Sequence, residues 1–219
     1  MENLYLSDSE CLDFSSADSG VSSYFIMTLL ICENLEISQK IQESLTKTVE
    51  KFKNEASNLS QLTQKLKGSS TSIDAKKYFF EHLPKAGWNI YSVIVNYSDA
   101  YTFLSMGGDQ NNFYNFLAKL LIEKINFPPV LKTVELMADR YRNKNDLKDF
   151  QKYLKNHIQF SMPKLKISIN ETQKLLDEIQ EFQAVDLFCW GIYKKYNGKD
   201  KEWYNIFKEF IKFEEIIQS

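Results

Sequence analysis

The chain has 219 residues, with 27 basic and 29 acidic side chains, and its net charge is therefore −2. This balance excludes a broadly basic protein that coats nucleic acid. Hydrophobic residues make up 43% of the chain and charged residues 26%, a composition that opposes both disorder and a coiled coil. The length fits a single domain spanning 1–219.

The cysteines and the apolar runs indicate a cytoplasmic protein. Cys11, Cys32 and Cys189 lack the paired spacing of a disulfide framework or a zinc site, so we expect them in a reducing compartment. The longest apolar run, Tyr24–Cys32, is interrupted by Thr28. It is too short to cross a bilayer, which needs about 20 residues, so we expect no membrane partner.

The first part of the chain predicts two strands followed by helices. A short apolar piece, Leu4–Leu6, precedes a polar loop over Ser7–Ser23. Tyr24–Cys32 is apolar enough to be a strand buried on both faces, and we expect it at the centre of the sheet. Apolar positions every three or four residues predict helices over Glu33–Asn54 and Asp74–Leu83.

The middle of the chain continues to alternate between strands and helices. β-Branched residues predict a strand over Trp88–Asn96, and helical periodicity follows over Phe113–Ile125. Two prolines then favour extended chain, so Val130–Asp139 is predicted to be a strand. A helix is predicted over Leu147–Phe160.

The last part predicts one strand and two helices. Lys164–Ile169 alternates apolar with polar residues, which is typical of a half-buried or edge strand. Helices are predicted over Glu178–Tyr196 and Lys201–Ile217. The order of elements indicates an α/β or α+β fold, in which a sheet of five or six strands carries helices on its faces.

Asp186 is the most informative residue. It lies on the apolar side of its predicted helix, among Phe182, Val185, Cys189, Ile192, Tyr193 and Tyr196. A buried carboxylate needs a compensating partner, so a lysine, backbone donors or a metal ion should meet it. Gln183 lies one turn earlier on nearly the same face. A cap or a salt bridge is the purely structural alternative.

A second carboxylate, Asp139, follows the strand predicted up to Ala138. Acids at strand ends gather in the open sites of α/β proteins. Glu135 points to the same face, but it lies about 13 Å farther back and is too distant to share one ion. Alternatively, Asp139 opens a turn over 140–145, because turns favour Asp.

The segment Lys65–Ser70 combines two lysines, a glycine and two hydroxyls, a combination that can hold phosphate, although it lacks the order of a P-loop. Without other context, this segment is expected to be an ordinary loop. No nucleophile elbow, zinc-protease motif or Cys/His cluster occurs. His82 and His157 are expected to be surface or packing residues.

Several motifs occur in an order that resembles a known family. They are Leu4–Glu10 with the aromatic strand start Tyr24–Ile26, then Lys65–Ser70, Leu136–Arg140, Phe182–Asp186 and Tyr193–Gly198. Over nearly the whole chain they resemble the bacterial domain-of-unknown-function family number 3800. The family's landmarks are Asp-Glu-Ser-Gly, Glu-x-Lys, a strand ending in Asp, and Leu-Gln-x-x-Asp. The resemblance implies an α/β, ribonuclease H-like fold, with a mixed sheet of five or six strands and helices on both faces.

The resemblance also implies a metal site. Asp139 and Asp186 map onto its acids, with Asp8 as a third candidate, and these three would be both catalytic residues and ligands of Mg²⁺ or Mn²⁺. Two such ions would activate a water and stabilise the leaving oxygen of a phosphodiester. Lys67, Arg140 and Gln183 would contact the substrate.

The chain departs from the family at important positions. Ser7 stands where the family has its leading Asp, Asp8 where it has Glu, and Glu10 where it has Gly. Without that carboxylate, metal binding should weaken, and Asp8 could replace it only if the strand slips by one residue. Lys65 replaces the Glu of Glu-x-Lys and would repel metal ions.

Two hypotheses follow. In the first, the protein is a metal-dependent nuclease with an impaired or intact site. In the second, it is an inactive family member that binds nucleic acid or a protein partner. That binding would use positive charges at Lys65, Lys67, Arg140 and Arg142.

Overall fold

The computed structural model describes residues 2–8, 24–52, 65–105, 109–127, 133–138, 144–161, 166–169 and 180–217. Its strands are β1 (Glu2–Asp8), β2 (Tyr24–Cys32), β3 (Trp88–Asn96), β4 (Thr133–Ala138), β5 (Lys166–Ile169) and β6 (Ile211–Ile217). Its α-helices are α1 (Leu35–Phe52), α2 (Ile73–Glu81), α3 (Tyr97–Ser105), α4 (Gln110–Glu123), α5 (Lys144–Ser161), α6 (Glu181–Tyr193) and α7 (Glu202–Phe207).

The described strands form one mixed sheet in the order β5-β4-β1-β2-β3-β6. β2 is antiparallel to both its neighbours, and every other neighbouring pair is parallel. The first five strands therefore have the order and directions of a ribonuclease H-like sheet, which confirms the predicted fold class. The central position of β2 and the edge position of β5 are confirmed as well.

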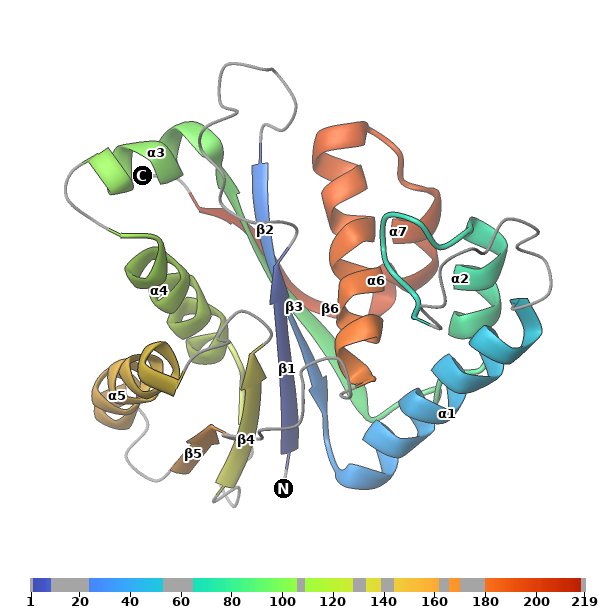
Figure 1. Ribbon diagram of the computed structural model, residues 1–219, viewed down its shortest axis with the longest axis horizontal. Helices are drawn as coiled ribbons and strands as arrows, with labels where there is room; N and C mark the ends of the chain where they lie inside the picture. The colour runs from blue at the N-terminus through green and yellow to red at the C-terminus, as the bar shows by residue number, and fades with distance from the viewer. Residues whose placement is uncertain are drawn as a thin grey trace.

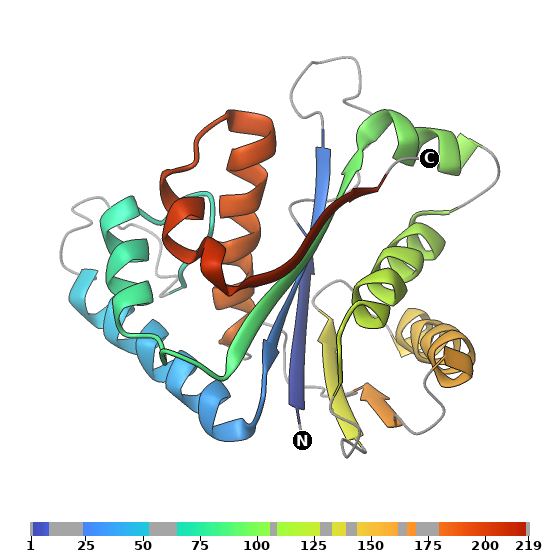
Figure 2. The same cartoon turned by 180° about the vertical axis from the view of Figure 1, so that it is seen from behind.

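Helices cover both faces of this sheet (Figures 1 and 2). On one face, α3, α4 and α5 pack against a core that includes Leu4 and Leu6 of β1. On the other face, α1, α2, α6 and α7 pack against a second core that includes Tyr5 of the same strand. Alternate side chains of β1 thus belong to different cores, as the two-residue period of a strand requires.

The C-terminal prediction is wrong. The helix predicted over 201–217 stops at Phe207, a 3₁₀ turn covers Lys208–Phe210, and β6 follows. β6 pairs with β3, where Tyr91 lies opposite Phe213 and Val95 opposite Ile217. Apolar residues in this segment fit a helical as well as an extended period, and pairing with a buried strand decides between them.

Two further differences concern a helix that was not predicted and the end of another helix. Helix α3 was not predicted; it follows β3 directly, and the Asn96 side chain accepts the backbone N–H of Ser98 at 2.9 Å at its start. Helix α6 ends at Tyr193, and a π-helical turn over Lys194–Gly198 follows it directly. Lys199 then takes a left-handed conformation with φ of 54°, which turns the chain towards α7.

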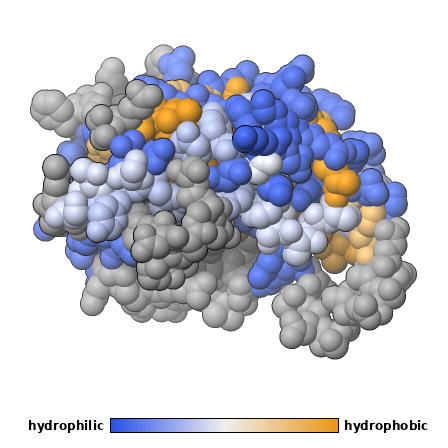
Figure 3. All heavy atoms as spheres, turned by 90° about the horizontal axis from the view of Figure 1, so that it is seen from above, coloured by the Kyte–Doolittle hydropathy of each residue, from blue (hydrophilic) through white to orange (hydrophobic). Residues whose placement is uncertain are grey.

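None of the helices in the described parts of the chain is long and apolar enough to cross a membrane. On the face seen from above, the coloured surface is mainly hydrophilic, with small separate hydrophobic patches (Figure 3). The large hydrophobic side chains that are exposed in the described ranges are Leu35, Tyr101, Phe103 and Ile216.

Candidate functional site at the 65–70 loop and helix α6

The segment 65–70 lies against α6 and is held there by two side chains of that helix. The Gln183 side-chain oxygen accepts the backbone N–H of Leu66 at 2.8 Å. One turn later, Asp186 Oδ2 accepts the backbone N–H of Gly68 at 2.7 Å. Two motifs that are more than 110 residues apart in sequence therefore form one structural unit.

Lys76 of α2 holds this unit from the other side. Its side chain is buried, and its Nζ donates to the carbonyl oxygen of Gly68 at 2.7 Å. The Gly68 residue is thus bonded through its N–H to a carboxylate and through its C=O to an ammonium. Each charged group therefore has one hydrogen bond to Gly68, which offsets part of the cost of removing it from water.

The carboxyl group of Asp186 is perturbed by its surroundings. Burial raises its pKa above the usual value, while the Gly68 N–H and the charges of Lys67 and Lys76 oppose the shift. Burial likewise lowers the pKa of Lys76. The sequence predicted that a lysine, backbone donors or a metal ion would meet Asp186, and the structure supplies a backbone donor with two lysines nearby.

Gly68 is required by the close approach of the loop to α6. A Cβ at this position would lie 2.3 Å from Trp190 Cβ and 2.8 Å from the backbone oxygen of Asp186. Both atoms belong to a helix packed on the sheet, so neither can move away cheaply. The glycine therefore lets the loop backbone reach the carboxylate.

The register of β1 decides where the first acidic motif points. Ser7 is buried and pairs with Thr28 of β2, and Asp8 pairs with Met27. Because faces alternate, Ser7 lies on the α6 face with Tyr5, whereas Asp8 lies on the face of Leu4 and Leu6. The described β1–β2 pairing is continuous, so alternation directs Asp8 away from the α6 face, and its role as a metal ligand stays a prediction.

A row of polar side chains crosses the sheet on the α6 face. Ser7 lies opposite Thr28, Thr28 opposite Ser92, and Ser92 opposite Glu214. The Thr28 and Ser92 hydroxyls are 3.2 Å apart, and both residues are fully buried. In the sequence, Thr28 stands out only as an interruption of an apolar run.

Glu214 lies at the end of this row. It belongs to a network of polar side chains that was not predicted from the sequence. Its carboxylate pairs with Lys195 and accepts the hydroxyls of Tyr196 at 2.7 Å and Tyr204 at 3.0 Å. Burial together with the hydrogen bond to Glu214 raises the pKa of Tyr196 to about 12. The network joins the π-helical turn, α7 and β6, and so fixes the C-terminal strand.

A second buried carboxylate, Glu181, fixes the start of α6. One of its oxygens accepts the Tyr5 hydroxyl at 2.7 Å and the Gln42 amide at 2.8 Å, and it also accepts the Ser38 hydroxyl. These donors come from β1 and α1. The signal in the sequence was weak, because Glu in the first turn of a helix is ordinarily a solvated residue.

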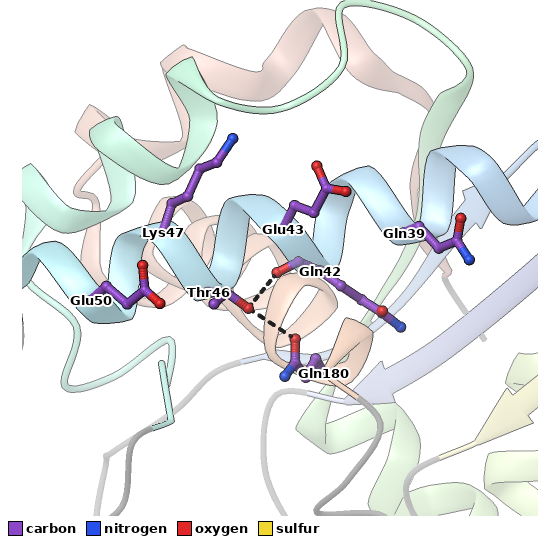
Figure 4. A pocket seen from close by; sticks show the side chains of 7 residues that line it. All are labelled: Gln39, Gln42, Glu43, Thr46, Lys47, Glu50 and Gln180. Carbon is purple, nitrogen blue, oxygen red and sulfur yellow. Dashed lines mark hydrogen bonds between the residues drawn. The ribbon is translucent and has the colours of Figure 1, made fainter.

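An open pocket of about 560 Å³ lies beside this network (Figure 4). Its lining comes from α1 and the residue before α6, and consists of Gln39, Gln42, Glu43, Thr46, Lys47, Glu50 and Gln180. Thr46 Oγ1 donates to the Gln42 carbonyl at 3.0 Å. Of the predicted site residues that the structure describes, namely Asp8, Lys67, Gln183 and Asp186, none lines this pocket.

The described residues do not complete a metal site. No group of three or more His, Cys, Asp or Glu side chains within them is placed to hold an ion. Asp186 and Asp8 both act electrostatically on Cys189. However, Asp186 lies on α6, whereas the alternation along β1 directs Asp8 to the opposite face of the sheet. Asp139 and Arg140 lie outside the described residues, so their predicted roles as metal ligand and substrate contact stay predictions.

No family model matches the chain, and no curated protein matches it. Among solved structures, a chain of the PCNA:RNase HII complex from Archaeoglobus fulgidus aligns with a TM-score of 0.48 and 7% sequence identity. The alignment covers 95% of this chain and 77% of that chain.

Proposed function

We propose that this chain is a ribonuclease H-like protein, of the bacterial family number 3800 that its motifs resemble, which binds nucleic acid beside Asp186 without efficient phosphodiester hydrolysis. The observation that carries this proposal is the register of β1. It presents the Ser7 hydroxyl, and not a carboxylate, on the face that carries α6 and Asp186. A neutral hydroxyl is a poor ligand for Mg²⁺, which prefers carboxylates, phosphates and water.

The charges around Asp186 support the same proposal. Lys67 and Lys76 both act on its carboxyl group, and Lys194 lies close enough to act on Lys76. Asp200 also acts on Lys76, so three ammonium groups stand against two carboxylates, and this local excess of positive charge favours an anionic ligand over a divalent cation. Lys67 is exposed, so it can contact a phosphate without rearrangement of the loop.

A test starts from direct binding and cleavage assays on the unmodified protein. We expect labelled RNA and DNA oligonucleotides to bind, as measured by fluorescence anisotropy, and to stay intact in millimolar Mn²⁺. Isothermal titration of Mn²⁺ into the protein should give no site-specific binding. Absence of binding to every oligonucleotide would reject the proposal and leave the predicted protein partner as the alternative.

Restoring the family pattern should restore the metal site. We expect the Ser7→Asp, Lys65→Glu double variant to bind Mn²⁺ at millimolar concentration, because it gains two carboxylates and loses one repelling positive charge. The matched control is Ser7→Asn with Lys65→Gln, which changes size in a similar way without adding carboxylates. Circular dichroism establishes that both variants fold.

A metal-dependent nuclease remains the second candidate, and one observation favours it. Asp186 is desolvated and its pKa is raised, as occurs for acids in catalytic sites. In that case, the unmodified protein would cleave an oligonucleotide in Mn²⁺, and Asp139→Asn and Asp186→Asn would each abolish cleavage.

A further inference from the structure

One stripe of α6 carries aromatic side chains next to Asp186. Trp190 and Tyr193 follow Asp186 by four and seven residues, so all three share one side of the helix. The two rings stack on each other, with centroids 5.0 Å apart and planes 15° apart. Both are partly exposed, whereas Trp88 and Trp203 are buried in the core.

The surroundings hold this aromatic pair in place. Gly68 lies directly against Trp190, since a Cβ on Gly68 would meet Trp190 Cβ at 2.3 Å. In addition, Lys194 Nζ lies 5.7 Å from the centre of the Trp190 ring. A stacked pair fixed by a loop loses little conformational freedom when a ligand binds.

Positive charge flanks the pair at both ends. Lys67 precedes Gly68 and is exposed, and Lys194 follows Tyr193 directly. Two carboxylates, Asp186 and Asp200, also lie nearby, since both act on the neighbouring Lys76. Asp186 is already bonded to the Gly68 N–H. The surface therefore combines a flat apolar plane with two ammonium groups that can contact phosphates.

This combination matches one class of ligand. Unpaired bases stack on aromatic side chains while lysines contact the neighbouring phosphates, and bases paired inside a duplex are not available for such stacking. We infer that Trp190 and Tyr193 form a base-stacking platform that makes the protein selective for single-stranded nucleic acid. The inference rests on the proposed function and adds the strandedness of the ligand.

The test uses three probes of about 12 nucleotides, a length suited to a small single-strand site. They are a single strand, the matched duplex, and an abasic strand with the same phosphates, each measured by fluorescence anisotropy. We expect the single strand to bind most tightly and, alone among the three, to quench tryptophan fluorescence. Trp190→Ala and Tyr193→Ala should each weaken its binding about 10-fold.

Two controls separate stacking from folding. Trp190→Phe keeps an aromatic plane and should retain most of the affinity. Tyr101→Ala removes a ring that is 58% exposed on α3, on the other side of the sheet, and should change nothing. Because the lysines remain, neither alanine variant in the platform should weaken binding of the abasic strand.

The outcomes distinguish the inference from the function on which it rests. Equal affinity for all three probes, unchanged in Trp190→Ala, would overturn the stacking platform and leave nucleic-acid binding intact. Failure of every probe to bind would overturn both.

Discussion

Gly68 and Asp186 illustrate how single residues set the site. A helix that packs on a sheet buries one side, and an acid on that side needs a donor. The donor is the backbone N–H of Gly68 at 2.7 Å, which only a residue without a side chain can bring so close to α6. The buried Lys76 completes the arrangement through the Gly68 carbonyl.

Gly68→Ala should destabilise the protein. The new Cβ would lie 2.3 Å from Trp190 Cβ and 2.8 Å from the Asp186 backbone oxygen, so the loop must move away and lose its bond to the carboxylate. We expect a loss of about 1–3 kcal/mol in the free energy of unfolding, measured by urea denaturation.

Gly198→Ala is the matched control for that substitution. A Cβ at Gly198 would meet only the flexible end of the Lys194 side chain, at 3.3 Å or more. Its effect should stay within about 0.5 kcal/mol. A similar loss in the free energy of unfolding in both variants would show that the close approach of the loop to α6 does not require a glycine at position 68.

At the scale of elements, β6 shows where periodicity fails. The residues from Trp203 to Ile217 contain apolar positions that fit a helix, yet the last seven residues of that stretch add a strand beside β3. Glu214 of β6 lies opposite Ser92 and pairs with Lys195, so three elements meet at one largely buried carboxylate. Contacts between distant parts of the chain, absent from any local pattern, select the strand.

Glu214→Gln should therefore destabilise the C-terminal elements. The side chains of Lys195 and Glu214 are only 21% and 11% exposed, and the substitution leaves the ammonium without its charged partner. We expect a loss of about 1–3 kcal/mol in the free energy of unfolding by chemical denaturation.

The neighbouring residue provides the control. Glu215 Oε2 lies 3.7 Å from Lys124 Nζ, and both side chains are about half exposed to solvent. Glu215→Gln should therefore cost less than about 0.5 kcal/mol, as is usual for exposed pairs. Equal losses in the two variants would contradict the structural role given to the network around Glu214.

For the whole molecule, the sequence predicted the class of fold because strands and helices alternate with clear periods. The site was only partly predictable. The periodicity of α6 placed Asp186 on the packed side, but no pattern shows that Gly68 is its donor. Nor does any local pattern show that Thr28, Ser92 and Glu214 line up across strands, because that depends on register.

The net charge of −2 gives a last prediction for the molecule as a whole. The overall charge does not attract an anion, so nucleic-acid binding should depend on a few local lysines. The logarithm of the affinity should then fall linearly with the logarithm of the salt concentration. Each phosphate contact contributes a slope of about −0.7 for a single strand. Lys67→Gln should make the slope shallower by about that amount, as measured by anisotropy titrations at several salt concentrations. Lys155→Gln, exposed on α5 across the sheet, should leave the slope unchanged; an equal effect of both substitutions would mean that the ligand is not bound beside Asp186.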